Sequence, residues 1–205
     1  MSATSPTTPR RILIVRLSAV GDVIHGLPVA SALREAFPEA WIGWVVEGRA
    51  GDLLEGHPAL DQLIRVPRRW LKSPRTVWQI RRKLKSLNVD TTVDLQCLTK
   101  SAVMALLSGA RRRLGVGGDD GRELSKWLNN ELTLVDAPHV VEHYLAILKP
   151  LGIESPAVRF ALPERDAERQ FAEQLIARCG LEPGRFACLN PGAGWPSKLW
   201  PAERY

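Results

Sequence analysis

The stretch RILIVRLSAVGDVIHGLP, residues 11–28, decides the fold. Its first part, RILIV (11–15), is a continuous apolar run, which is typical of a parallel strand buried on both faces. Apolar side chains then recur at helical spacing over DVIHGLPVASALREAF (22–37), although Pro28 stands in the second turn, where a helix can kink. The stretch therefore predicts a buried strand that opens into a helix.

The same alternation continues along the chain. WIGWVV (41–46), TTVDLQ (91–96) and RRRLGV (111–116) read as further strands, and KSAVMALLSG (100–109) reads as a helix that Gly109 ends. Strands that alternate with helices indicate βαβ units. Residues 10–155 are therefore expected to form a Rossmann-like, doubly wound α/β domain.

Near residue 155 the pattern changes. ESPAVRFALPE (154–164) is extended and rich in proline, and an amphipathic helix follows at 164–180, closed by Gly180. RFACLN (185–190) then reads as a strand that leads into a glycine-rich turn and a helix start at Pro201. Because one strand and one helix cannot bury a sheet, residues 156–205 are expected to be a linker and the incomplete beginning of a second α/β domain.

Composition limits the partners and the compartment. The chain of 205 residues is 45% hydrophobic, carries a formal charge of +6 and has a pI near 9.6, which favours an anionic partner. Its three cysteines show neither disulfide-framework nor zinc spacing, which favours the reducing cytoplasm. No apolar run is long enough to span a membrane, so membrane contact is expected to be peripheral.

Asp22 is the first candidate functional residue. It stands where the first strand gives way to a helix, and the carboxyl ends of parallel strands are where open α/β sheets bind ligands. Asp is also a favoured N-cap, so a purely structural role is open. A cap can face a ligand as well, and a general base at this position would be kept ionised by the helix dipole.

The second candidate is NPGAGWPSKLWP, residues 190–201, in which two glycines precede Lys198. Such a turn can direct backbone N–H groups at a phosphate while the lysine supplies a charge. It lacks the spacing of a Walker P-loop, and no GxGxxG motif follows the first strand. A plain turn with a solvated lysine is the alternative.

The third candidate is a basic run without acids between Arg65 and Asn88. Val77, Ile80, Leu84 and Leu87 form a core-facing stripe that leaves the cations outward. The run is either a solvated helix face or an anion site at the helix entrance. Its cations are Arg68, Arg69, Lys72, Arg75, Arg81, Arg82, Lys83 and Lys85.

Lys100 is a weaker candidate. It begins a helix directly after a strand, where the helix dipole opposes a cation, and this misfit suggests an anionic ligand. Arg122 and His139 lie in or beside expected loops, where a solvated or structural role is the alternative.

These motifs together resemble the lipopolysaccharide heptosyltransferases of glycosyltransferase family nine. ILIVRLSAVGDVIHGLPV is similar to the opening strand, loop and helix of that family, HPALDQLI and VDLQCLTKSA are similar to later segments, and NPGAGWPSKLWPAERY is similar to its donor-site turn. The resemblance implies a GT-B architecture of two Rossmann-like domains, of which only the start of the second is present here.

The resemblance also implies an activity: inverting transfer of heptose from ADP-heptose to a Kdo residue of Kdo-lipid A, at the inner face of the inner membrane. It implies that Asp22 is the catalytic base. It implies donor contacts from Ser18, Gly21, Gly192, Ala193, Gly194 and Lys198. It implies acceptor contacts from Arg68, Arg69, Lys72, Lys100, Arg122 and His139.

No DxD-like carboxylate cluster is present, so the reaction is expected to need no metal and no cofactor. Other readings stay open: a family-nine transferase with another sugar or acceptor, or a fragment that binds the acceptor without activity. A nucleic-acid-binding module is disfavoured, because several tryptophans, such as Trp41 and Trp44, fall in expected strands rather than among exposed cations.

Overall fold

The computed structural model describes residues 8–118, 121, 123–190, 192–193 and 196–204. They divide into two compact units, one that ends at Pro163 and one that begins at Glu164. The assignment of 10–155 and 156–205 as separate domains stays a prediction. Among the described residues, no helix has both the length and the apolar character that crossing a membrane requires.

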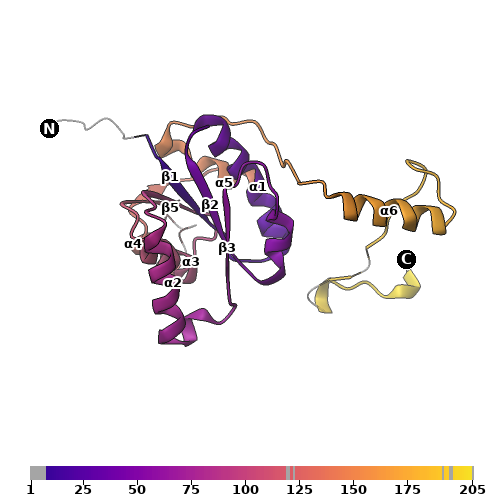
Figure 1. The fold of residues 1–205 in the computed structure, drawn as a ribbon, viewed down its shortest axis with the longest axis horizontal. Coiled ribbons are helices and arrows are strands. Elements are labelled where there is room, and N and C mark those ends of the chain that lie inside the picture. Colours follow the sequence, from indigo (N-terminus) through magenta and orange to yellow (C-terminus); the bar gives the residue numbers. More distant parts are fainter. Residues whose placement is uncertain (1–7, 119–120, 122, 191, 194–195, 205) are drawn as a thin grey trace. The chain divides into compact units, whose positions relative to one another are not determined.

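The first unit is built on a parallel sheet in the order β3-β2-β1-β4-β5-β6 (Figure 1). The predicted strands at 11–15, 41–46, 91–96 and 111–116 are confirmed with small changes of boundary, and two strands that the pattern did not indicate, β3 and β6, lie at the edges. The strands are β1 (Arg11–Val15), β2 (Trp41–Glu47), β3 (Gln62–Val66), β4 (Thr91–Asp94), β5 (Arg112–Val116) and β6 (Glu131–Thr133).

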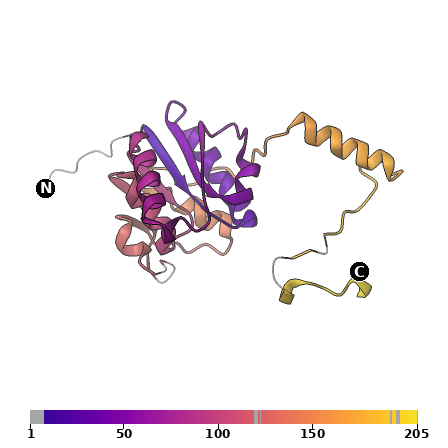
Figure 2. The same cartoon turned by 60° about the horizontal axis from the view of Figure 1, so that its bottom comes forward.

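Helices cover both faces of this sheet (Figure 1; Figure 2 shows the same arrangement from a second angle). Alternate residues of β1 explain this, because Ile12 and Ile14 pack into one buried core with α1 and α5, while Leu13 and Val15 pack into another with α2 and α3. The helices of this unit are α1 (Val20–Ala36), α2 (Pro74–Ser86), α3 (Thr99–Ser108), α4 (Ser125–Leu128) and α5 (Val140–Ala146).

Local sequence signals set the helix boundaries. Helix α1 runs on through Pro28. Ser73 caps α2 by accepting a hydrogen bond from the Thr76 N–H (3.3 Å), and Pro74 takes its first position, where a missing N–H costs nothing. Gly109 ends α3 in the left-handed region (φ 80°), as the sequence predicts. Short 3₁₀ helices are η1 (Gly48–Leu54), η2 (Trp70–Lys72) and η4 (Lys149–Leu151).

The second unit contains the predicted amphipathic helix as α6 (Asp166–Arg178), which ends before Gly180 (φ 63°). The prediction of a strand at 185–190 is wrong, because these residues are exposed and belong to no sheet. A strand needs a neighbouring strand, and the described part of this unit supplies none. The helix start at Pro201 is a single 3₁₀ turn. The 3₁₀ helices here are η5 (Pro196–Lys198) and η6 (Ala202–Arg204).

Candidate active site

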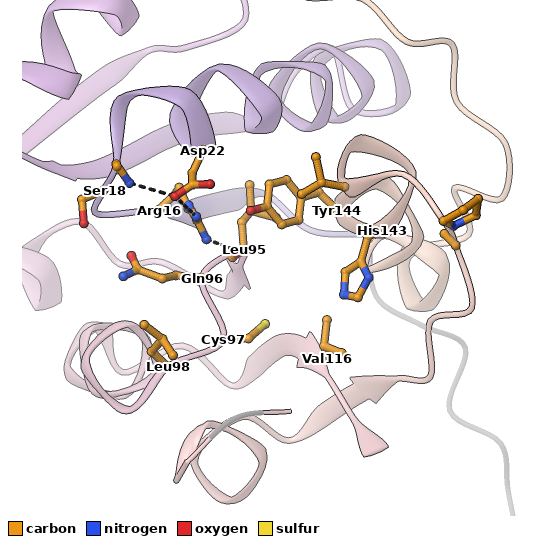
Figure 3. Close-up of a pocket in the computed structure, with 14 residues that line it drawn as sticks. Arg16, Ser18, Asp22, Leu95, Gln96, Cys97, Leu98, Val116, His143 and Tyr144 are labelled. Atoms are coloured by element: carbon orange, nitrogen blue, oxygen red, sulfur yellow. Dashed lines mark hydrogen bonds and ion pairs between the residues drawn. The ribbon is translucent and has the colours of Figure 1, made fainter. Parts of the chain in front are cut away.

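A cavity of about 640 Å³ lies in the first unit, where β1 and β4 end and α1 and α5 begin (Figure 3). This is the carboxyl edge of the parallel strands, where α/β sheets of this kind bind ligands. It is lined by Arg16, Ser18, Ala19, Asp22, Leu95, Gln96, Cys97, Leu98, Val116, Ala137, Pro138, Val140, His143 and Tyr144.

Asp22 faces this cavity from the first turn of α1, with 43% of its side chain exposed. It is not the N-cap that one interpretation of the sequence made it: the N-cap is Ala19, and Asp22 is three residues further along. From there its Oδ2 accepts a hydrogen bond from the Ala19 N–H (3.0 Å), which satisfies one free donor at the helix start. Capping and exposure to the cavity are therefore combined in one carboxylate.

Two groups hold that carboxylate in its ionised form. Burial raises the pKa of Asp22, but the hydrogen bond from the Ala19 N–H and the charge of Arg16 outweigh burial, so the pKa lies below its ordinary value. The Arg16 Nη2 lies 2.6 Å from Asp22 Oδ2. At neutral pH the cavity therefore contains an ionised, partly accessible carboxylate.

Arg16 itself is buried. It follows β1 directly, donates from Nη1 to the Leu95 carbonyl (2.9 Å) and lies over the ring of Tyr144 (5.4 Å to the centroid). Its Nε has no hydrogen-bond partner among the residues that the structure describes. Contacts to the loop after β4 and to helices α1 and α5 fix the guanidinium, so that it orients Asp22 as well as neutralising it.

The opposite wall comes from α5 and from the loop after β4. Tyr144 and His143 project from α5 toward Asp22 and Val116, respectively, in Figure 3. Gln96 is held by its Oε1, which accepts a hydrogen bond from the Leu17 N–H (2.9 Å). The cavity thus combines a charged corner with polar and aromatic side chains on the opposite wall, groups that can orient a polar ligand.

The floor is organised by Asp94, which is fully buried at the end of β4. Its Oδ1 accepts hydrogen bonds from the Gln96 and Cys97 N–H groups (3.0 Å each), and its Oδ2 accepts one from Asn129 Nδ2 (3.1 Å). Burial raises the pKa of Asp94, while these hydrogen bonds oppose the rise. Asn129 packs so closely on Gly115 that a Cβ there would lie 2.5 Å from its Nδ2.

Lys100 has an anionic partner, but the partner belongs to the protein. Its Nζ is ion-paired with Glu47, whose side chain is 4% exposed at the end of β2, and it donates a hydrogen bond to the Arg68 carbonyl (3.1 Å). The buried Glu47 carboxylate therefore compensates the cation at this helix start, and contact of Lys100 with an acceptor stays a prediction. Lys100 ties the β3–η2 loop to the sheet.

The other predicted acceptor residues of that loop are solvent-exposed. Arg68, Arg69 and Lys72 are exposed around η2, and the Arg68 guanidinium lies beside Gly48, where a Cβ would meet its Nε at 3.3 Å. They do not line the 640 Å³ cavity. Their contact with an acceptor stays a prediction.

Three more predicted residues lie at helix starts, Ser18 and Gly21 at that of α1 and His139 at that of α5. Ser18 lines the cavity, whereas Gly21 is exposed and has no neighbour within 4 Å of a Cβ position. His139 caps α5, since its Nδ1 accepts a hydrogen bond from the Val141 N–H (3.3 Å), and its ring lies 6.5 Å from that of His25. His139 is exposed and is not part of the cavity lining.

The predicted donor turn belongs to the second unit. Gly192 and Ala193 are exposed, and the Gly192 N–H donates to Asn190 Oδ1 (3.1 Å). Lys198 is exposed at the end of η5. Gly194 and Arg122 lie outside the described residues. Within the residues described, no three His, Cys, Asp or Glu side chains are grouped as metal ligands, and metal independence stays a prediction.

Sequence reasoning missed Arg16, Gln96, His143 and Tyr144. Arg16 and Gln96 immediately follow the strands at 11–15 and 91–94, so polar residues just after buried strands were a signal that could have found them. Nothing local marks His143 or Tyr144, because only the tertiary fold brings α5 against α1.

Comparison with known proteins agrees with this picture. The model of glycosyltransferase family 9 (heptosyltransferase) matches residues 77–205. The chain is 26% identical over 201 residues to lipopolysaccharide core heptosyltransferase OpsX of Haemophilus influenzae and 28% identical over 204 residues to lipopolysaccharide heptosyltransferase 1 of Pseudomonas aeruginosa. The matches cover 96% and 93% of this chain but only 55% and 54% of those proteins.

A solved structure gives the same result. E. coli heptosyltransferase WaaC with ADP-2-deoxy-2-fluoro heptose superposes with a TM-score of 0.68 at 27% identity, over 94% of this chain and 62% of that one. The Rossmann-like sheet expected from the sequence is confirmed, and its neighbours are family 9 transferases of the GT-B type. The chain spans little more than half the length of its curated relatives, and it belongs to glycosyltransferase family 9, the heptosyltransferases.

Proposed function

We propose that this protein is a lipopolysaccharide heptosyltransferase that transfers heptose from ADP-heptose to a Kdo residue of Kdo-lipid A, with inversion and without a metal. The observation that carries the proposal is the Arg16–Asp22 pair in the cavity at the carboxyl edge of the sheet. Membership of family 9 and the names of the relatives support the choice of sugar and of lipopolysaccharide as acceptor.

The proposed chemistry needs a base near the attacking hydroxyl and positive charge near the departing diphosphate, on opposite sides of the anomeric carbon. A Kdo hydroxyl attacks the anomeric carbon of the heptose while Asp22 takes its proton, and the bond to ADP breaks on the other face of the sugar, which inverts the configuration. Asp22 suits this role because its carboxylate is ionised and reaches the cavity.

The departing diphosphate gains negative charge that must be stabilised. In this proposal, Lys198 and the turn formed by Gly192, Ala193 and Gly194 supply that stabilisation, together with Ser18 and Gly21. The basic residues Arg68, Arg69 and Lys72 bind Kdo carboxylates and lipid A phosphates, with help from Arg122 and His139. Lys100 belongs to the same proposed acceptor-binding set, and it also holds the Arg68 carbonyl. A cytoplasmic location at an anionic membrane leaflet completes the proposal.

One experiment tests the substrate assignment. The intact protein is incubated with ADP-heptose and either Kdo-lipid A or an acceptor that already carries heptose, with and without a chelator, and the product is identified by mass spectrometry. Transfer to Kdo-lipid A alone, unaffected by the chelator, is expected. Transfer only to the heptosylated acceptor would show a different family 9 activity, and binding without transfer would reduce the protein to an acceptor-binding module.

A further inference from the structure

The helices on the two faces of the sheet differ in charge. Helices α2, α3 and α4, all fully described, carry seven Lys or Arg residues and no acid, whereas α1 and α5 carry Arg34 against the acids Asp22, Glu35 and Glu142. Figure 1 shows α2, α3 and α4 on the same side of the strands. One face of the first unit is therefore strongly cationic.

Most of these cations are available to an external partner. Five belong to α2 and one, Lys126, to α4; all six are exposed, and none is ion-paired to a carboxylate among the described residues. Lys100 is the exception, because it is engaged by Glu47. The five of α2 are Arg75, Arg81, Arg82, Lys83 and Lys85.

Large apolar side chains stand among these cations. Trp127 is 77% exposed on α4 beside Leu124 (55%), and Trp78 is 59% exposed on α2, with the Arg82 guanidinium 5.7 Å from its ring centroid. Leu106 of α3 and Leu71 of η2 are also exposed. A shallow hollow of about 490 Å³ opens beside Trp78, with Arg82 and Lys83 at its rim.

The combination distinguishes between two anionic partners. A single-stranded nucleic acid gains from stacking on aromatic rings and from cations, but exposed leucines add nothing to that mode of binding. The interface of a lipid bilayer accepts all three kinds of side chain: cations meet the headgroup phosphates, tryptophans lie at headgroup depth, and leucines reach the acyl boundary. Leu124 next to Trp127, and Leu106 between the two tryptophan-bearing helices, favour the bilayer.

We infer that the α2–α3–α4 face docks on an anionic lipid bilayer, with the cations of α2 and Lys126 on phosphates and with Trp127, Leu124 and Trp78 inserted at the interface. The docking surface is separate from the cavity that contains Asp22. It deepens the proposed function, because a lipid-anchored acceptor requires its enzyme to come to the membrane. The binding itself involves neither sugar donor nor acceptor, so the two proposals can fail independently.

Binding is tested by sedimentation of the intact protein with vesicles of phosphatidylcholine, with and without phosphatidylglycerol. We expect binding only to the anionic vesicles, and release at high salt. The variant R81Q/R82Q/K83Q/K85Q should partition roughly 600-fold more weakly, since each of the four cations near an anionic surface contributes about five-fold. The matched control K149Q/R159Q/R178Q/R204Q removes four exposed cations elsewhere and should bind as the parent does.

Insertion is tested separately. W127A should weaken partition about ten-fold, the value of roughly 60 Å² of apolar surface, whereas W200A, an exposed tryptophan of the second unit, should change little. Lipids that are brominated near the headgroup should quench the tryptophan fluorescence of the parent more than that of W127A. Circular dichroism confirms that each variant is folded.

Three results would overturn the inference. Equal binding by the charge variant and the parent would show that the cations are merely solvated. Binding of W127A that equals the parent's, without a difference in quenching, would remove the inserted surface. Binding to single-stranded RNA that W78A and W127A abolish, with vesicle binding absent, would assign the face to a nucleic acid.

Discussion

Arg16 Nη2 lies 2.6 Å from Asp22 Oδ2, across the junction between the first strand and the first helix. The pair unites a buried guanidinium with a carboxylate that is 43% exposed, so one end is fixed by the core and the other meets the cavity. The buried Arg16 side chain therefore fixes the position of the Asp22 carboxylate at the edge of the sheet.

The first prediction concerns the carboxylate. D22N should lower the rate of heptose transfer by on the order of 10² to 10⁴, because Asn keeps an oxygen for the Ala19 N–H but cannot take the acceptor proton. Turnover with saturating substrates measures the loss, and a cooperative thermal unfolding transition shows that the fold is kept. Turnover close to that of the parent would leave Asp22 with its helix-capping role alone.

The second prediction concerns the guanidinium. Since Arg16 lowers the pKa of Asp22, R16Q should raise that pKa and move the acid limb of the kcat/KM profile to higher pH. The pH–rate profile is compared with that of R159Q, which removes an exposed arginine elsewhere. If R16Q lowers the rate equally at every pH, Arg16 contributes packing and not electrostatics.

The third prediction concerns Lys100. K100M should reduce the free energy of unfolding by about 3 kcal/mol, because it leaves Glu47 buried without its cation. The double variant E47Q/K100M should recover most of the loss, as measured by urea denaturation. A stable K100M protein with weakened acceptor binding would restore the ligand-binding role that the sequence suggested.

The fourth prediction concerns pH and His57. This buried imidazole accepts a hydrogen bond from the Ala59 N–H on Nδ1 (3.2 Å), and its Nε2 lies 3.2 Å from the Phe160 carbonyl. Burial lowers its pKa, although the contact with the Phe160 carbonyl opposes the shift. In the unfolded chain His57 regains its ordinary pKa near 6.5 and binds a proton more readily.

The stability that His57 contributes is therefore complete above about pH 6.5 and is lost as the pH falls through the lower folded-state pKa. The free energy of unfolding is measured by urea denaturation between pH 5 and pH 8. In the acidic part of this range it should change less steeply with pH for H57Q than for the parent. Parallel curves for the two proteins would contradict the prediction.

The fifth prediction separates the substrates. The charge reversal R68E/R69E/K72E should weaken acceptor binding far more than donor binding, because the proposed acceptor carries carboxylates and phosphates and the three side chains are exposed in one loop. Calorimetry with ADP and with a Kdo-bearing acceptor analogue measures both affinities. Equal losses for the two ligands would argue against this division.

Much of the fold could be predicted because buried strands such as Ile12–Val15 are continuous apolar runs. The edge strands could not, because β6 is only three residues long and β3 mixes buried residues with half-buried and exposed ones. The strand expected at 185–190 shows the opposite error, since its side chains suit a strand but the described residues around it offer no partner.

The site was predictable only in part. Asp22 could be found because its place after the first strand is a property of the local sequence. Its surroundings depend on the tertiary fold, because Tyr144 comes from a helix more than a hundred residues further along the chain. The ion pair of Lys100 with Glu47 likewise joins residues that are far apart in the sequence. Which charged residues meet at the ends of the strands depends on the order of the strands in the sheet, and the local sequence does not reveal that order.

The buried link from Gly115 through Asn129 to Asp94 has a consequence for protein engineering. Neither Gly115 nor Asn129 lines the cavity, yet Asn129 fits only against a bare backbone and holds the carboxylate that shapes the turn under the cavity. A redesign of the cavity that changes only lining residues should keep this turn, whereas G115A should displace it. The three positions depend on one another through these contacts and should be exchanged together or left alone.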